Sequence, residues 1–202
     1  MLKTKIAVLV SGGGTNLQAI IDFAKEGNLN HGELALVVSN NEGAYALERA
    51  KNNGIDTLVI TRKTPEERLA FEGKLINALE EKGIDLIILA GFMCILSENF
   101  TKKYDKRIIN VHPSLIPSFC GTGFYGLRVH EEALKYGVKV TGATVHFVNE
   151  IPDGGEIIMQ KAVYIEDGDT PEVLQKIVME QADWIILTQA VEKVSEKIAK
   201  EK

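Results

Sequence analysis

The sequence predicts an α/β fold: a single domain, 1–202, with a doubly wound, mostly parallel sheet and antiparallel strands added in the C-terminal half. Continuously apolar runs alternate with segments of helical spacing in the first half, and two longer strands follow each other after about residue 138. Such apolar strands are typical of a parallel sheet that helices cover on both faces. Because no repeat or linker divides the chain, we expect one sizeable core.

The first half contains five apolar runs that we expect to be strands. They lie at 6–10, 34–38, 57–60, 84–90 and 107–111. The first helix is expected to begin at Thr15, where Gln18 three residues later completes a capping box. Further helices are expected at 43–53 and 65–81. This alternation predicts a Rossmann-like N-terminal half.

The second half begins with two strands in succession, at 139–148 and 156–165, joined by residues 149–155. We expect these strands to pair antiparallel at the far side of the same sheet. Thr170, followed by Pro171, is expected to cap a final helix that continues toward Lys200.

Charge and cysteine content limit the function classes. A net charge of −5 offers no broad basic surface, which disfavours nucleic-acid binding. Cys94 and Cys120 are isolated and form no CxxC motif, so neither a disulfide framework nor a zinc site is expected. The first apolar run is too short to span a membrane, and no secretory cleavage pattern follows it. We therefore expect a cytoplasmic protein without a metal or a membrane partner.

A glycine-rich turn follows the first strand. Its candidate phosphate-binding residues are Gly12, Gly13, Gly14, Thr15 and Asn16. Glycines let the backbone approach a ligand, and a helix N-terminus attracts anions. Leu17 replaces the third glycine of a dinucleotide fingerprint, and no lysine follows as in an ATP-binding loop. A monophosphate fits best, and the alternative is a tight turn without a ligand.

Asn110 and His112 form the sharpest chemical signal. Side chains two residues apart on a strand face the same side, and ligands bind at the carboxyl ends of parallel strands. An amide and an imidazole could donate hydrogen bonds to a developing oxyanion, and the imidazole could also move protons. The alternative is that His112, before Pro113, is a structural residue bonded to a backbone carbonyl.

Asp153 lies in the connection between the two late strands. Asp-Gly is a common hairpin signal, so a plain turn is the alternative. The expected strand order could nevertheless bring its carboxylate to His112, where it would orient the ring or accept a proton. The segment 117–126, rich in glycine and aromatic residues, reads either as a mobile lid or as a plain surface loop.

The remaining histidines and Cys94 give weaker signals. His146 alternates with apolar neighbours and is expected to be a packed strand residue, whereas His31 and His130 are expected to be solvated. Cys94 is expected to be a small core residue or part of a pocket wall.

Taken together, these motifs resemble the phosphoribosylglycinamide formyltransferase family. The matching segments keep the family's order from about residue 5 to about residue 190. They are 11–20, 90–93, 110–115, 146–148 and 153–155. The resemblance implies formyl transfer from 10-formyltetrahydrofolate, a co-substrate, to the amine of glycinamide ribonucleotide in de novo purine biosynthesis. It implies a phosphate-binding half at 1–105 and a catalytic and folate-binding half at 106–202.

The resemblance also implies the roles of individual residues. Asn110 and His112 would stabilise the oxyanion, and Asp153 would orient His112 and help proton transfer. The glycine turn would hold the substrate phosphate. The implied folate-binding residues are Arg68, Met93, Cys94, Ile95, Leu96 and Asn110, with further pocket walls from 145 to 153.

Two positions depart from the family pattern. The family often has arginine where this chain has Cys94. The family also tends to have an acidic residue that binds the substrate near position 181. This chain has Gln181 there, with Glu180 next to it.

Other functions remain open at this stage. They are a formyltetrahydrofolate hydrolase, a formyltransferase acting on another amine, a non-catalytic nucleotide-binding module and a nicotinamide oxidoreductase. The hydrolase usually carries a further N-terminal domain. The oxidoreductase is disfavoured because Leu17 replaces the third glycine of the dinucleotide fingerprint. The protein could be a monomer or a homodimer.

Overall fold

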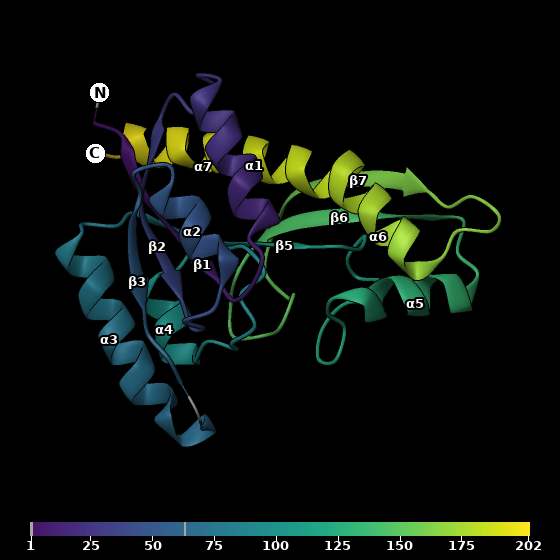
Figure 1. The fold of residues 1–202 in the computed structure, drawn as a ribbon, viewed down its shortest axis with the longest axis horizontal. Coiled ribbons are helices and arrows are strands. Elements are labelled where there is room, and N and C mark those ends of the chain that lie inside the picture. The colour runs from purple at the N-terminus through teal and green to yellow at the C-terminus, as the bar shows by residue number, and fades with distance from the viewer. Residues whose placement is uncertain (1, 63) are drawn as a thin grey trace.

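The computed structural model describes residues 2–62 and 64–202, and within them one seven-stranded sheet has the order β3-β2-β1-β4-β5-β6-β7 (Figure 1). Met1 and Lys63, which the expected domain 1–202 includes, lie outside the described residues. The strands are β1 (Thr4–Val10), β2 (Gly32–Ser39), β3 (Asp56–Val59), β4 (Leu86–Leu89), β5 (Ile108–His112), β6 (Val140–Phe147) and β7 (Ile157–Tyr164).

Helices connect these strands. The α-helices are α1 (Thr15–Lys25), α2 (Tyr45–Lys51), α3 (Arg68–Glu81), α4 (Glu98–Lys103), α5 (Leu127–Tyr136), α6 (Pro171–Val178) and α7 (Trp184–Lys200). A short 3-10 turn, η1 (Pro65–Glu67), precedes α3, and a π-helical turn, η2 (Met179–Asp183), joins α6 to α7.

The pairing of the strands confirms the predicted fold class. Strands β1 to β5 pair parallel with one another, whereas β6 pairs antiparallel with both β5 and β7. The chain runs from β1 outward to β2 and β3 and then returns to place β4 on the other side of β1. The carboxyl ends of β1 and β4 therefore lie at a topological switch point, where open α/β sheets bind ligands.

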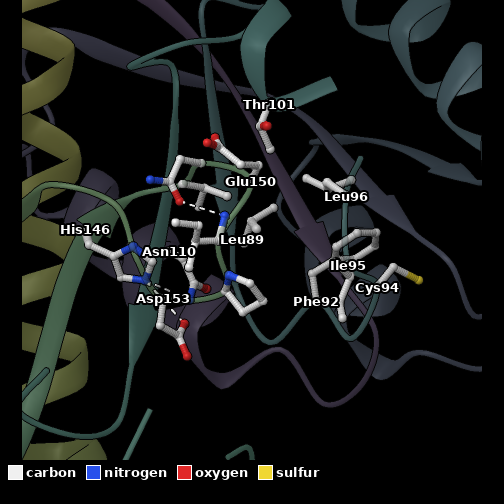
Figure 2. Close-up of a pocket in the computed structure, with 14 residues that line it drawn as sticks. Leu89, Phe92, Cys94, Ile95, Leu96, Thr101, Asn110, His146, Glu150 and Asp153 are labelled. Atoms are coloured by element: carbon white, nitrogen blue, oxygen red, sulfur yellow. Dashed lines mark hydrogen bonds and ion pairs between the residues drawn. The ribbon is translucent and has the colours of Figure 1, made fainter. Parts of the chain in front are cut away.

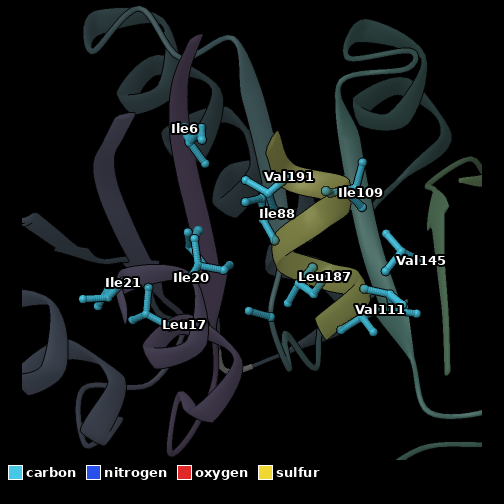
Figure 3. Close-up of a cluster of buried hydrophobic side chains, with 14 of the residues drawn as sticks. Ile6, Leu17, Ile20, Ile21, Ile88, Ile109, Val111, Val145, Leu187 and Val191 are labelled. Atoms are coloured by element: carbon cyan, nitrogen blue, oxygen red, sulfur yellow. The ribbon is translucent and has the colours of Figure 1, made fainter. Parts of the chain in front are cut away.

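Helices cover both faces of the sheet with apolar side chains. On one face, Leu187 and Val191 of α7 belong to a buried cluster that also contains Ile109 (Figure 3). On the other face, Leu75 of α3 and Phe100 of α4 belong to a separate buried cluster. Two apolar faces on one sheet explain why its central strands read as continuous apolar runs.

The expected capping box at the start of α1 is wrong. Gly14 occupies the N-cap position with φ 72°, and Thr15 is the first helical residue. The side chain of Gln18 bonds instead to Asp22 Oδ1 at 2.8 Å. A Cβ at Gly14 would lie 2.6 Å from the Cβ of Ala46, so close packing against α2 requires glycine there.

The other boundaries differ from expectation in smaller ways. Thr170 caps α6 as predicted, accepting a hydrogen bond from the amide of Val173, but η2 interrupts the expected single final helix. Neither α4 nor α5 was expected from the sequence pattern. The first is a short helix capped by Ser97, and the second buries only a narrow stripe that includes Val129 and Ala133.

Candidate active site

The glycine turn lies between β1 and the first turn of α1. The Gly12 carbonyl accepts a hydrogen bond from the Ala46 amide at 3.1 Å, and the Gly13 carbonyl accepts one from Arg49 Nε at 2.8 Å. A Cβ at Gly12 or Gly13 would meet no heavy atom within 4 Å. The turn is thus held from one side by α2 while space remains around two of its glycines. The first amides of α1 lack intrahelical partners, which makes this a suitable place for an anion.

The loop after β4 lies against this turn. The amide of Met93 donates to Ser11 Oγ at 2.9 Å, and Asn40 Nδ2 donates to Cys94 Sγ at 3.1 Å. Thr15 Oγ1 donates to the sulfur of Met179 at 3.6 Å. These contacts join the ends of β1, β2 and β4 and bring η2 to the start of α1.

The polar pair on β5 and the late aspartate meet, as predicted. Asp153 Oδ2 lies 3.5 Å from His112 Nδ1, and Asp153 Oδ1 lies 3.5 Å from His146 Nε2. Asn110 Nδ2 lies 3.3 Å from the same nitrogen of His146. The side chain of Asp153 is 13% exposed and that of His112 is 6% exposed, so their electrostatic interaction is only weakly screened.

Several groups keep Asp153 ionised. Burial, the largest influence, raises its pKa, but the hydrogen bond with His146, the charge of His112 and the Gly121 amide together lower the pKa below its ordinary value. The Gly121 amide donates to Asp153 Oδ2 at 2.8 Å. A carboxylate next to two imidazoles can orient a ring or accept a proton.

The segment 117–126 contributes backbone groups to this cluster. His112 Nε2 lies 2.8 Å from the carbonyl oxygen of Phe119. The alternative role of His112, bonded to a backbone carbonyl, therefore coexists with its contact to Asp153. The segment is not a plain surface loop, because Phe119 and Gly121 both contact the cluster.

His146 contributes to the cluster, which its local sequence did not predict. Its ring is a packed strand residue, as expected, with 1% of the residue exposed, but it also contacts Asn110 and Asp153. The pairing of β5 with β6 places His146 directly opposite Asn110. Directly opposed side chains on neighbouring strands interact, so the register of this pair was the signal that could have found it.

A cavity of about 120 Å³ opens beside the cluster (Figure 2). Figure 2 shows Asn110, His146 and Asp153 on one side of it and Phe92, Cys94 and Ile95 on the other. Its lining residues include Leu89, Phe92, Cys94, Ile95, Leu96, Asn110, His146 and the segment 148–153. The expectation that Cys94 forms part of a pocket wall is thereby confirmed.

Three of the expected catalytic and folate-binding residues do not line this cavity. His112 is separated from it, although Asp153, which contacts His112, lines it. Met93 directs its amide to Ser11 and leaves 59% of the residue exposed. Arg68 is exposed at the start of α3. Of the implied folate residues, the structure brings together Cys94, Ile95, Leu96 and Asn110.

Two histidines expected to be solvated are not. His130 is 1% exposed on α5, and burial together with nearby His112 lowers its pKa to about 4. Neither of its ring nitrogens has a hydrogen-bond partner among the described residues. His31 is half-buried, and its Nδ1 lies 2.6 Å from a carboxylate oxygen of Glu192. The ring of His31 thus pairs with a residue of α7, and the ring of His130 is buried although its local sequence is polar.

The π-helical turn η2 contains two acidic residues near Gln181, Glu180 and Asp183. Glu180 is exposed and lies 3.9 Å from the Lys176 ammonium, and Gln181 is also exposed. Asp183 is 8% exposed, and its Oδ1 is buried without a hydrogen-bond partner in the described part of the chain. Burial raises the pKa of Asp183 to about 7. Asp183, which the sequence analysis did not single out, is the buried acid of this turn.

Asp183 is expected to make the protein less stable as the pH rises. The native state holds its proton up to about pH 7, whereas the unfolded chain releases it near the ordinary value of 3.8, so the free energy of unfolding falls across this range. The loss is at most about 4 kcal/mol by about pH 8. Asp183→Asn should flatten this dependence in urea titrations, while Glu180→Gln should leave it unchanged. Equal slopes in Asp183→Asn and wild type would contradict a raised pKa.

The chain shows no sign of a metal centre or a membrane span in the regions described. Residues 2–62 and 64–202 contain no group of three or more His, Cys, Asp or Glu side chains that could hold a metal ion. None of the helices within these ranges is long and apolar enough to cross a membrane.

The sequence and the fold are similar to those of formyl transferases. A family model described as formyl transferase matches residues 4–191. Phosphoribosylglycinamide formyltransferase of Haemophilus influenzae is 41% identical over 177 residues, which cover 88% of this chain and 81% of that protein. The crystal structure of glycinamide ribonucleotide transformylase 1 from Symbiobacterium toebii shares 40% identity with a TM-score of 0.87, covering 96% of this chain and 89% of that one.

Some relatives are much longer. The human trifunctional purine biosynthetic protein adenosine-3 is 45% identical over 174 residues, which are 86% of this chain but 17% of that protein. The chain thus corresponds to about a sixth of the length of that relative.

Proposed function

The chain belongs to the formyl transferase family, and from this premise we propose that it transfers the formyl group of 10-formyltetrahydrofolate to the amine of glycinamide ribonucleotide, giving formylglycinamide ribonucleotide in de novo purine biosynthesis. The observation that carries the proposal is the meeting of Asn110, His112 and Asp153 beside a cavity at the carboxyl edge of the sheet. The glycine turn after β1 lies at the same edge.

The relatives support the choice of reaction and acceptor. The bacterial relative and the solved structure carry names that specify formyl transfer to this ribonucleotide, and each aligns over most of its own length. Neither a formyltetrahydrofolate hydrolase nor a non-catalytic nucleotide-binding module is favoured by these names. The isolated free cysteines fit a reducing compartment, and we place the activity in the cytoplasm.

The chemistry follows from the polar cluster. The substrate amine attacks the formyl carbon, a carbon–nitrogen bond forms, and the bond from that carbon to the folate nitrogen then breaks. The Asn110 amide nitrogen, 3.3 Å from His146 Nε2, can donate a hydrogen bond to the oxyanion of the tetrahedral intermediate. Protonated His112 stabilises the same charge electrostatically, and Asp153 orients His112 and passes the proton of the attacking amine to the folate nitrogen that leaves.

The two substrates would occupy neighbouring regions. The cavity has apolar walls from Phe92, Leu96 and Val148 and polar groups at one side, which suits a flat heteroaromatic ring. The phosphate of the ribonucleotide would bind the amides of residues 12–16 at the start of α1. In this proposal Met93 and Arg68 contact only the outer part of the folate.

Substitutions of two adjacent glycines separate ligand binding from folding. Gly13→Ala adds a methyl group where no protein atom lies within 4 Å, so the unfolding midpoint should hardly change. The KM for glycinamide ribonucleotide should rise at least about tenfold, because the methyl group would occupy space that the phosphate needs. Gly14→Ala should instead destabilise the fold, since it combines φ 72° with a clash against Ala46. An unchanged KM in Gly13→Ala would contradict phosphate binding at this turn.

A folate absorbance assay tests the proposed reaction. The wild type is incubated with 10-formyltetrahydrofolate and a panel of amines that includes glycinamide ribonucleotide, its dephosphorylated form and glycinamide. Deformylation is expected only with the phosphorylated acceptor, together with stoichiometric formylated product. Release of formate without an acceptor would indicate a hydrolase, and binding of the ribonucleotide without turnover would indicate a non-catalytic module.

A further inference from the structure

We propose that the turn formed by Phe119, Cys120 and Gly121 is a positioning element that fixes His112 so that its ring gains and loses the working proton at Nδ1. The inference rests on the proposed function and deepens it, because it assigns the nitrogen that acts and the backbone groups that select it.

The turn contacts both members of the catalytic pair through backbone atoms. The Phe119 carbonyl lies 2.8 Å from His112 Nε2, and two residues later the Gly121 amide lies 2.8 Å from Asp153 Oδ2. That carboxylate oxygen is also the one that lies 3.5 Å from His112 Nδ1. His112, Asp153 and the turn therefore form a closed ring of contacts, in which each member limits the positions of the other two.

The contacts decide where the protons lie. A carbonyl oxygen only accepts hydrogen bonds, so His112 Nε2 must carry the hydrogen that it shares with Phe119. In the neutral ring, Nδ1 is then the unprotonated nitrogen. A proton taken up by His112 enters at Nδ1, directly facing the Asp153 carboxylate. The Gly121 amide favours the ionised form of that carboxylate, since an N–H donor stabilises the anion.

The side chain of Phe119 anchors the turn. Its ring packs edge-on against Phe124, with centroids 6.4 Å apart, and against Tyr136, with centroids 6.0 Å apart. The backbone of Phe119 has φ 49°, a conformation that residues other than glycine rarely adopt. The surrounding contacts must therefore hold it there. Ser114 Oγ donates to the Ser118 carbonyl at 2.6 Å and ties the preceding residue to the end of β5.

The other ionisable groups around the pair leave this assignment intact. His146 and His112 both approach Asp153, Cys120 lies near the same carboxylate, and His130 lies near His112. Among these groups, Asp153 is the one whose side chain lies within 3.5 Å of a ring nitrogen of His112. Burial, with a smaller contribution from nearby His112, lowers the pKa of His130 to about 4, so this neighbouring ring stays neutral and adds no positive charge beside the pair.

Nuclear magnetic resonance of the intact protein tests the assignment without any assay of activity. Long-range proton–nitrogen correlation spectra of protein with labelled histidines report which ring nitrogen carries hydrogen, and His112→Gln identifies the signals of His112. We expect the neutral ring to carry its hydrogen on Nε2. A neutral ring protonated on Nδ1 would overturn the proposal, whether or not the enzyme transfers formyl groups. Conversely, the expected tautomer in a protein without formyl transfer would refute only the proposed function.

Variants of the turn test its effect on the reaction. Phe119→Ala should lower kcat about tenfold, the effect of weakening one hydrogen bond to a charged group, and should leave both KM values within about twofold. Phe119→Tyr should restore kcat. Tyr125→Ala, which removes an exposed aromatic ring from the same segment, is the matched control and should behave like wild type.

A backbone substitution covers the case in which Phe119→Ala fails to fold. Replacing Gly121 with glycolic acid by nonsense suppression changes its amide to an ester and removes only the N–H that Asp153 accepts. We expect the same loss of kcat and a shift of the acid limb of the rate profile to higher pH. Wild-type kcat and an unshifted limb in the ester variant would overturn the role of the turn.

Discussion

His112→Ala is expected to lower kcat for formyl transfer about a thousandfold. The substitution removes a proton carrier, whose contribution is typically about a hundredfold to ten-thousandfold, and a positive charge that stabilises the oxyanion electrostatically. It also leaves Asp153 without one of the groups that lower its pKa. The KM values for both substrates should change little, because the ring contributes no surface to the cavity. Steady-state kinetics with saturating folate and saturating ribonucleotide measure the loss.

A matched histidine controls for general damage to the fold. His31→Ala removes a half-buried ring that pairs with Glu192, outside the catalytic cluster, so kcat should remain near that of wild type. Circular dichroism of both variants establishes that they fold. If folded His112→Ala retains more than about a tenth of the wild-type kcat, His112 takes no part in the chemistry.

The strand pattern and the main polar cluster were accessible from the sequence because they depend on local regularities. Continuous apolar runs identify parallel strands that are buried on both faces, and the two-residue period of a strand places Asn110 and His112 on one side. The expectation that the Asp153 carboxylate could reach His112 depended on the strand order. Because β6 lies next to β5, the connection 149–155 that follows β6 lies close to β5.

The residues that were missed depend on contacts between distant segments. His146 reads as an ordinary strand residue until the register with β5 sets it opposite Asn110. Asp183 lies in a π-helical turn, and a sequence gives little indication that one extra residue in a turn has rotated an acid inward. The capping box at Thr15 failed because packing against Ala46 selects glycine as the cap.

The folate residues show the same limit. The resemblance implied a continuous set from Met93 to Leu96, but neighbouring residues in a loop point in different directions. The Met93 amide is used to join two loops, and its side chain is exposed, whereas Leu96 is 8% exposed at the cavity. Arg68 belongs to a different element, and only the position of α3 relative to the cavity decides whether it reaches a ligand.

Asp153→Asn is expected to lower kcat at least about a hundredfold while folate binding remains within about threefold of wild type. The amide has nearly the same shape and keeps an oxygen that can accept the Gly121 hydrogen bond, so the cavity wall should be preserved. What it lacks is the charge that stabilises protonated His112 and the basic oxygen that accepts the amine proton. Equilibrium binding of a folate and single-turnover kinetics separate these two effects.

The same variant changes the response of stability to acid. Because the pKa of Asp153 is lowered in the native state, its ionisation stabilises the fold above its ordinary titration range, and this stabilisation is lost as the pH falls through the lowered value. Asp153→Asn should therefore be destabilised relative to wild type at neutral pH, and the difference should shrink as the pH falls below the ordinary range of a carboxyl group. A folded variant with wild-type kcat would remove Asp153 from the mechanism. A full loss of both kcat and folate binding would instead show that the carboxylate is also needed to shape the folate cavity.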